Sequence, residues 1–192
     1  LMPGKYTAKS SYEVYYPGKN GNQNQVTISA NQKQTEPNTT AHFGVSGDCG
    51  TASASWSNAK NGFAFALDHQ AAILVFQPYT GNTVLNDCYL TKIEVTSNND
   101  ITDTYTFDFT TNKLTGGTPW SSTNHKQIIL TTKGSGTYVD GFPLTNSAAD
   151  LTTNGAYMVI KPGTHKLRIR YWVKDVANNI EGTITKVLSS FN

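Results

Sequence analysis

The stretch FAFALDHQAAILVF, residues 63–76, decides the fold class because its apolar side chains alternate with a period of two. Such alternation is typical of a β-strand with one buried face. The two successive in-phase sets are Phe63, Phe65, Leu67 and His69, then Ala72, Leu74 and Phe76. The change of parity between the sets requires an inserted residue or a bend. We therefore expect a β-bulge or sharp bend at residues 70–71, where the chain passes from one sheet of a sandwich to another.

Strand patterns continue outward from this stretch in both directions. Further strands are expected at residues 12–16, 26–28, 89–95, 105–109, 127–132, 167–173 and 180–188. Residues 156–160 are apolar on both faces, which indicates a central strand, whereas the small side chains of residues 44–56 indicate an edge. Residues 148–151 fit one helical turn, but no window carries a sustained helical stripe. We predict an all-β protein, an antiparallel β-sandwich of about seven or more strands with long loops.

The in-phase apolar positions also predict the core. Its expected members are Phe65, Leu67, Leu74, Phe76, Ile93, Phe107, Ile169 and Tyr171. A chain of 192 residues buries roughly 70% of its unfolded surface, so folding needs neither a metal nor a disulfide. We expect residues 1–192 to form a single sandwich domain. Because the chain begins at Leu1 without an export signal, we expect it to be a piece of a longer exported protein.

Composition and charge exclude several classes of function. Charged residues make up 15% of the chain, against roughly 25% in typical soluble domains. The net charge is +2, and the nearest approach to a basic cluster is Lys166, Arg168, Arg170 and Lys174, which fits one face of a strand. This pattern does not favour nucleic-acid binding. No apolar run approaches the roughly 20 residues that a transmembrane helix requires.

No combination of residues predicts catalysis. The four histidines are scattered, without a metal-binding spacing, and no serine stands in a nucleophile elbow. His69 is in phase with Leu67, so we interpret it as a core-edge histidine bonded to backbone, with Asp68 on the opposite face. We expect a protein that is not an enzyme, with no catalytic, cofactor-binding or metal-binding residues and no cofactor. Cys49 and Cys88 either form one disulfide or remain two buried thiols.

Three tryptophans are the candidates for binding: Trp56, Trp120 and Trp172. Trp172 shares a strand face with Arg168 and Arg170, opposite the apolar face of that strand. If this face is exposed, the indole ring can stack on a sugar or a partner protein. The alternative is that a loop covers the outer face of the sheet.

Several short motifs resemble the fimbrillin-like family, the subunits of type V pili on anaerobic Gram-negative bacteria. The pattern F-x-L-x-H-x-x-A-x-L-x-F of residues 65–76 is similar to a signature of that family. The other matching segments follow in the family's order: residues 12–17 (YEVYYP), 32–38 (QKQTEPN), 46–48 (SGD), 161–163 (KPG), 167–171 and 185–186. Together they span most of the chain.

The resemblance implies a transthyretin-like, Greek-key sandwich that assembles by strand exchange. It also implies lipoprotein export and a location at the cell surface, on the outer membrane. The chain is then expected to be a stalk, tip or anchor subunit of a fimbria that mediates adhesion. Its partners would be other pilus subunits, with a host protein or glycan as a further partner. The alternative is a non-catalytic carbohydrate-binding module at the cell surface.

The chain departs from a complete member of this family. A lipobox cysteine, a second sandwich domain and a strand beyond Phe191 do not occur in it. We therefore expect a sheet that lacks a strand and leaves an apolar groove uncovered.

Overall fold

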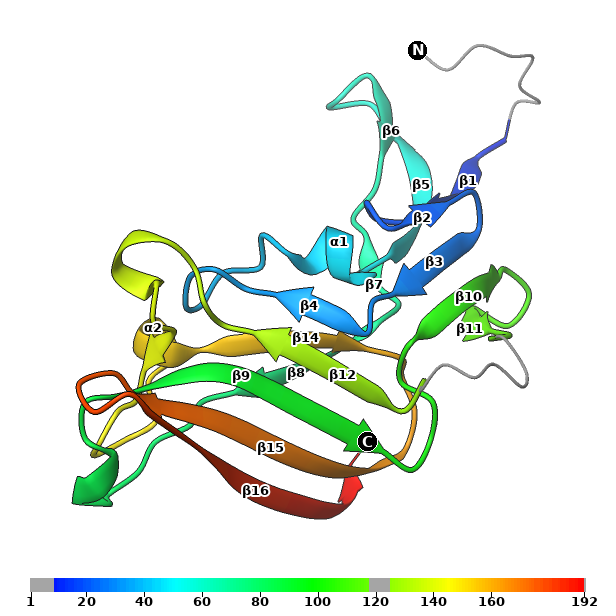
Figure 1. The fold of residues 1–192 in the computed structure, drawn as a ribbon. Coiled ribbons are helices and arrows are strands. Elements are labelled where there is room, and N and C mark those ends of the chain that lie inside the picture. Colours follow the sequence, from blue (N-terminus) through cyan, green and yellow to red (C-terminus); the bar gives the residue numbers. More distant parts are fainter. Residues whose placement is uncertain (1–8, 118–124, 192) are drawn as a thin grey trace.

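The computed structural model describes residues 9–117 and 125–191, and within them two sheets face each other as an antiparallel β-sandwich (Figure 1). The predicted all-β sandwich is thereby confirmed. The larger layer is ordered β16 (Ile180–Phe191), β15 (His165–Asp175), β9 (Cys88–Ser97), β12 (Gln127–Thr131) and β4 (Asn31–Lys33), with β13 (Phe142–Pro143) also paired to β9. Its neighbours are antiparallel except β12 and β4, which run parallel.

The smaller layer consists of β14 (Ala156–Ile160) and β8 (Ala72–Phe76), paired antiparallel. Apolar side chains of both layers meet between them and form the core, which includes Leu74, Met158, Ile160, Leu90, Ile93, Leu130 and Leu167. The short helix α2 (Leu151–Asn154) leads into β14, and the Asp150 carboxylate caps it by accepting a hydrogen bond of 2.9 Å from Thr152 N–H. The helical turn expected at residues 148–151 thus lies three residues further on.

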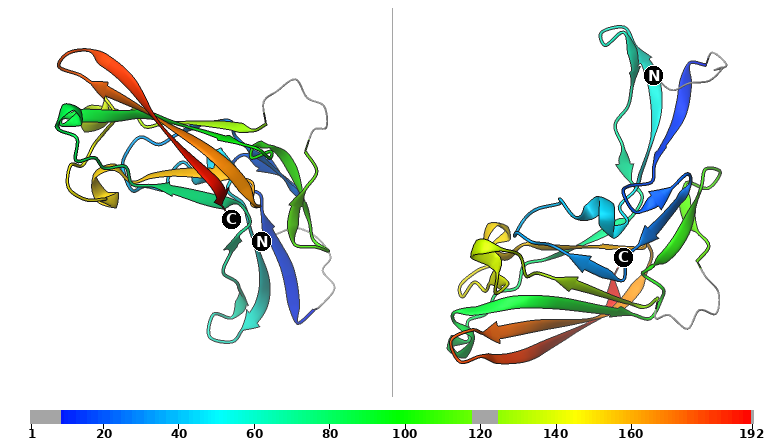
Figure 2. Two further views of the ribbon diagram at one scale, coloured as in Figure 1. Left: turned by 90° about the horizontal axis from the view of Figure 1, so that it is seen from below. Right: turned by 45° about the horizontal axis from the view of Figure 1, so that its top comes forward.

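The remaining described strands form two smaller sheets. One is ordered β11 (Lys113–Thr115), β10 (Asp103–Asp108), β3 (Gln25–Ile28) and β2 (Gly21–Asn22). The other contains β1 (Ser11–Tyr16), β5 (Gly50–Ser57) and β6 (Gly62–Ala64), with β7 (Asp68–His69) also paired to β5. This last sheet, which we call the arm, extends away from the sandwich (Figure 2). The rings of Tyr15 and Phe107, stacked 5.0 Å apart, join the two smaller sheets.

Three helical turns occupy connections: α1 (Phe43–Ser46), η1 (Thr83–Leu85) and η2 (Gly136–Tyr138). Helix α1 ends at Gly47, whose φ of 106° lies in the left-handed region. A Cβ atom at this position would lie 2.5 Å from the Thr27 carbonyl oxygen, so only glycine allows this close approach to β3.

The predicted change of sheet at residues 70–71 is confirmed. Strand β7 pairs with β5 in the arm, whereas β8 pairs with β14 in the sandwich. Gln70 N–H donates to the Cys49 carbonyl at the transition, at 2.9 Å. Five of the predicted core residues are buried, namely Leu74, Phe76, Ile93, Phe107 and Ile169, and Tyr171 is partly buried against the core.

Two predicted core residues are not in the core. Phe65 is 54% exposed and Leu67 is 41% exposed, because they belong to the arm rather than to a layer of the sandwich. Alternation identifies side chains that share a face, but it does not show that another layer covers this face.

Two strand positions also differ from the prediction. Residues 44–56 do not form an edge, since β5 lies between β1 on one side and β6 and β7 on the other. Residues 156–160 do not form a strand with two strand neighbours, because β14 pairs with β8 alone among the described strands.

Candidate strand-binding groove

The two edges of the smaller layer differ in whether their backbone groups have hydrogen-bond partners. Along the outer edge of β14, buried glutamine side chains take the place of a neighbouring strand. Gln32 Nε2 donates to the Val159 carbonyl at 2.7 Å, and Gln32 Oε1 accepts from Val159 N–H at 2.9 Å. Gln34 repeats this pattern with the Gly155 carbonyl at 2.9 Å and Tyr157 N–H at 2.8 Å. Side-chain amides therefore satisfy backbone groups along this edge, although the Gly155 carbonyl also accepts from Asn38 N–H at 2.8 Å.

The other edge of the smaller layer belongs to β8, and no strand within the described residues pairs with it. In a strand, the backbone N–H and C=O groups point alternately to the two sides, so about half of those in β8 face this edge. An edge of this kind is a template for pairing with another strand.

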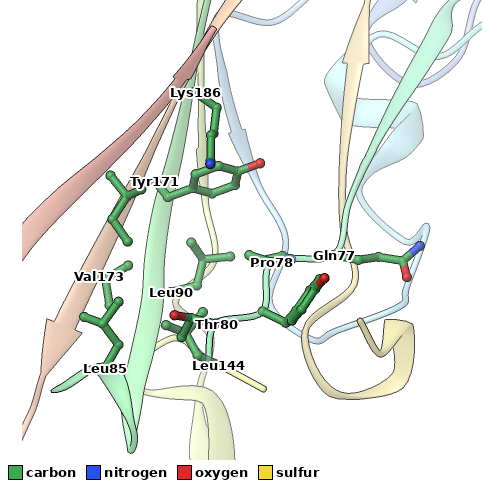
Figure 3. Close-up of a pocket in the computed structure, with 11 residues that line it drawn as sticks. Gln77, Pro78, Thr80, Leu85, Leu90, Leu144, Tyr171, Val173 and Lys186 are labelled. Carbon is green, nitrogen blue, oxygen red and sulfur yellow. The ribbon is translucent and has the colours of Figure 1, made fainter. Parts of the chain in front are cut away.

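An open apolar groove runs beside this edge, between the two layers, and we call it the β8–β16 groove. It consists of three adjoining cavities of about 360, 320 and 270 Å³. The first and second share Tyr171 and Lys186, and the first and third share Val173 and Ile184. Figure 3 shows the first cavity, with Tyr171, Val173 and Leu90 from the larger layer opposite the segment that follows β8.

The second cavity places core side chains of both layers at the wall of the groove. Leu74 and Phe76 of β8 lie on one side, and Leu167 and Ile169 of β15 lie on the other. The Phe76 ring meets the Tyr171 ring edge-on at 6.3 Å. Burial raises the pKa of Tyr171. The groove therefore offers apolar side-chain contacts next to an unpaired strand edge.

Strand β16 forms the outer wall of the groove and is an edge strand itself. Among the described strands it pairs with β15 alone, and its side chains are exposed from Glu181 to Ser189. Ile184 and Leu188 line the groove although they are 39% and 37% exposed. Lys186 is the one charged residue that lines the first two cavities.

The sequence-predicted binding candidate Trp172 is not a free platform. It is partly buried, and the Lys92 ammonium lies 3.8 Å from the centre of its ring. Its neighbour Arg170 pairs with Glu94 at 3.5 Å. Trp56 lies in the arm and is 52% exposed, whereas Trp120 lies outside the described residues.

The interpretation of His69 as a core-edge histidine bonded to backbone is wrong. Its side chain is 63% exposed, and Nδ1 lies 2.8 Å from an Asp48 carboxylate oxygen. Asp48 comes from the connection before β5, 21 residues away, so no local pattern could have identified it. Within residues 9–117 and 125–191, no group of three or more His, Cys, Asp or Glu residues could hold a metal ion. The absence of enzymatic activity stays a prediction.

Both cysteines are buried free thiols, so the disulfide alternative is not realised. Desolvation raises the pKa of Cys49 to about 11 and also raises the pKa of Cys88. Because the thiolate is the reactive form, we expect a disulfide-exchange reagent to modify the native protein slowly at neutral pH. After unfolding without a reductant, the same reagent should titrate both thiols. If the unfolded chain had no reactive thiol, the two cysteines would be bonded and the free thiols of this structure would be contradicted.

In the described part of the chain, no helix has the length and apolar character needed to cross a membrane. Comparison with known proteins gives no match: no protein-family model, no curated protein and no solved structure matches this chain. The resemblance to fimbrillin-like proteins therefore stays a prediction from the motifs.

Proposed function

We propose that the protein is a structural subunit of a cell-surface fimbria or pilus that receives a strand from another subunit in the β8–β16 groove. The observation that carries this proposal is the unpaired edge of β8 beside apolar cavities. A strand from a partner would pair with this edge through main-chain hydrogen bonds. Its alternate side chains would then enter the cavities and complete the core.

The contrast between the two edges of the smaller layer supports a specific site. The edge of β14 is closed by Gln32 and Gln34, so strand addition there would first have to remove buried hydrogen bonds. The edge of β8 requires no such loss. The order of the fimbrillin-like motifs gives independent support and points to a stalk, tip or anchor subunit exposed on the outer membrane, acting in adhesion.

The alternative, a carbohydrate-binding module, loses Trp172, one of its three candidate tryptophans. Trp172 is partly buried and covered by Lys92, so it does not present a ring face to a sugar. We therefore favour the structural subunit.

The test is to add a strand to the purified protein and measure the melting temperature. The probes are short synthetic peptides that alternate Val or Ile with Thr, and scrambled peptides of equal composition serve as controls. A peptide at about 100 times its Kd stabilises the protein by roughly 2.7 kcal/mol. For a chain of this size, that corresponds to an increase of roughly 5–10 °C.

A groove variant makes this test specific. Ile184→Lys places a charge in the groove at a position that is 39% exposed, so the fold should tolerate it. We expect that the peptide no longer raises the melting temperature of this variant. The control Val139→Lys, at an exposed position outside the groove, should keep the peptide-induced increase in melting temperature. If no alternating peptide raises the melting temperature, or if Ile184→Lys responds like the parent, strand insertion at this groove is wrong.

A further inference from the structure

The arm carries an exposed apolar face that the proposed strand insertion does not use. In the β1–β5 and β5–β6 pairs, residues opposite each other project to the same side of the sheet. The register pairs Tyr12 with Ala54, Tyr16 with Gly50, and Trp56 with Phe63. Strands β6 and β7 hold the same register on β5, so Phe65 and Leu67, between them, belong to this side as well. We call this side the arm face.

The arm face is large for an exposed apolar surface. Tyr16, Trp56, Phe63, Phe65 and Leu67 are each 41–54% exposed. An aromatic side chain has roughly 150–250 Å² to bury, so these five side chains together expose roughly 400–500 Å². This is the size of the largest apolar patch on a typical monomeric protein, a patch that is often functional. The opposite side of the arm is already used, since Tyr15 stacks on Phe107.

The chemistry of the arm face favours a protein surface over a glycan. The side chains paired across β1, β5 and β6 on this side are uncharged, whereas His69 of β7, opposite Gly50 on the same side, contacts the Asp48 carboxylate at 2.8 Å. Trp56 Nε1 donates to Asn58 Oδ1 at 2.8 Å, so the indole N–H is already satisfied. The Phe63 ring meets both Tyr12 and Trp56 edge-on, at 83° and 78° between ring planes, which gives no flat platform for a sugar ring.

We propose that the arm face is a self-association surface, on which two copies of this chain pack sheet against sheet around a two-fold axis. Two such faces would bury roughly 800–1,000 Å² of these side chains alone, near the lower limit of about 1,000 Å² for a specific interface. A largely apolar sheet face is complementary to itself, as the inner faces of a sandwich are. The arm extends away from the sandwich (Figure 2), which leaves it accessible to a second copy.

The experiment is sedimentation of the whole chain over a wide range of concentration. We expect a reversible monomer–dimer equilibrium, weakened more than about tenfold by the double variant Phe63→Ser, Phe65→Ser. Phe65→Glu is a second variant at the more exposed of the two rings, in case the double variant does not fold. The matched control is Val139→Ser, an equally exposed apolar position outside the arm, which should leave the equilibrium unchanged.

Three results would overturn this inference. The first is a monomer at every concentration. The second is a dimer that neither arm variant weakens, which would place the contact elsewhere on the molecule. The third is a monomer whose tryptophan fluorescence changes with an oligosaccharide, in a way that Phe65→Glu abolishes. Because the arm face lies outside the β8–β16 groove, none of these results bears on strand insertion.

Discussion

Replacing Gln34 with leucine is expected to reduce the free energy of unfolding by about 1–3 kcal/mol. Gln34 is fully buried, and its amide bonds the Tyr157 N–H, the Gly155 carbonyl and the Glu36 carbonyl. Leucine has a similar size, so the change removes the hydrogen bonds and creates little space. Each buried backbone group left without a partner costs roughly 1–3 kcal/mol. The loss comes mainly from the Tyr157 N–H, because the Gly155 carbonyl keeps the hydrogen bond that it accepts from Asn38 N–H at 2.8 Å.

Urea unfolding of Gln34→Leu measures this effect. The control is Gln25→Leu, at an exposed position on β3, where a change within about 0.5 kcal/mol is expected. A loss below about 1 kcal/mol at Gln34 would mean that another group or water replaces the amide at the edge of β14.

Phe76→Ala should cost about 3–5 kcal/mol, since it removes a large side chain from the core. Phe76 is 4% exposed, belongs to the core cluster and contacts the Tyr171 ring. Phe65 provides the matched control, because the same alternating stretch predicts both residues as core. At 54% exposure, Phe65→Ala should cost less than about 1 kcal/mol in dilute protein, where self-association does not contribute.

Thermal and urea unfolding of both alanine variants test whether burial at these two positions follows the alternation in the sequence or the structure. Equal losses at the two positions would show that the arm is packed as tightly as the sandwich. A small loss at Phe76 would place its ring outside the core and would remove one wall of the β8–β16 groove.

The sequence predicts the strands well because alternation is a local property. The pattern of residues 167–173 corresponds to β15, in which Leu167, Ile169 and Val173 are buried. The change of parity near residue 70 correctly locates the passage from the arm to the sandwich. In both cases the evidence lies within a few residues.

The prediction fails where burial depends on a distant layer. Phe65 and Leu74 alternate equally well, but only Leu74 faces a second sheet. The small residues of β5 suggested an edge, yet β1, its strand neighbour on one side, comes from a distant part of the chain. The His69–Asp48 pair is hidden for the same reason.

The groove was expected from the family resemblance and not from any local pattern. The closed edge of β14 was not predicted, because residues 31–40, which contain the two glutamines, have the composition of a polar loop. The signal was present in the alternation of Gln32 and Gln34 with Asn31 and Lys33. A period of two among amides indicates a strand whose inward side chains are polar, and such side chains must find partners when buried.

The glutamines that close β14 also determine how the sandwich responds to force. In an ordinary sandwich, apolar side chains alone join the two layers, and such contacts can be exchanged gradually as one layer slides past the other. Here Gln32 belongs to β4, which is hydrogen-bonded into the larger layer, while its amide holds β14 of the smaller layer. Sliding along the strands therefore loads directional hydrogen bonds that have to break together. A shear clamp of this kind lets the domain yield abruptly at high tension rather than creep at low tension.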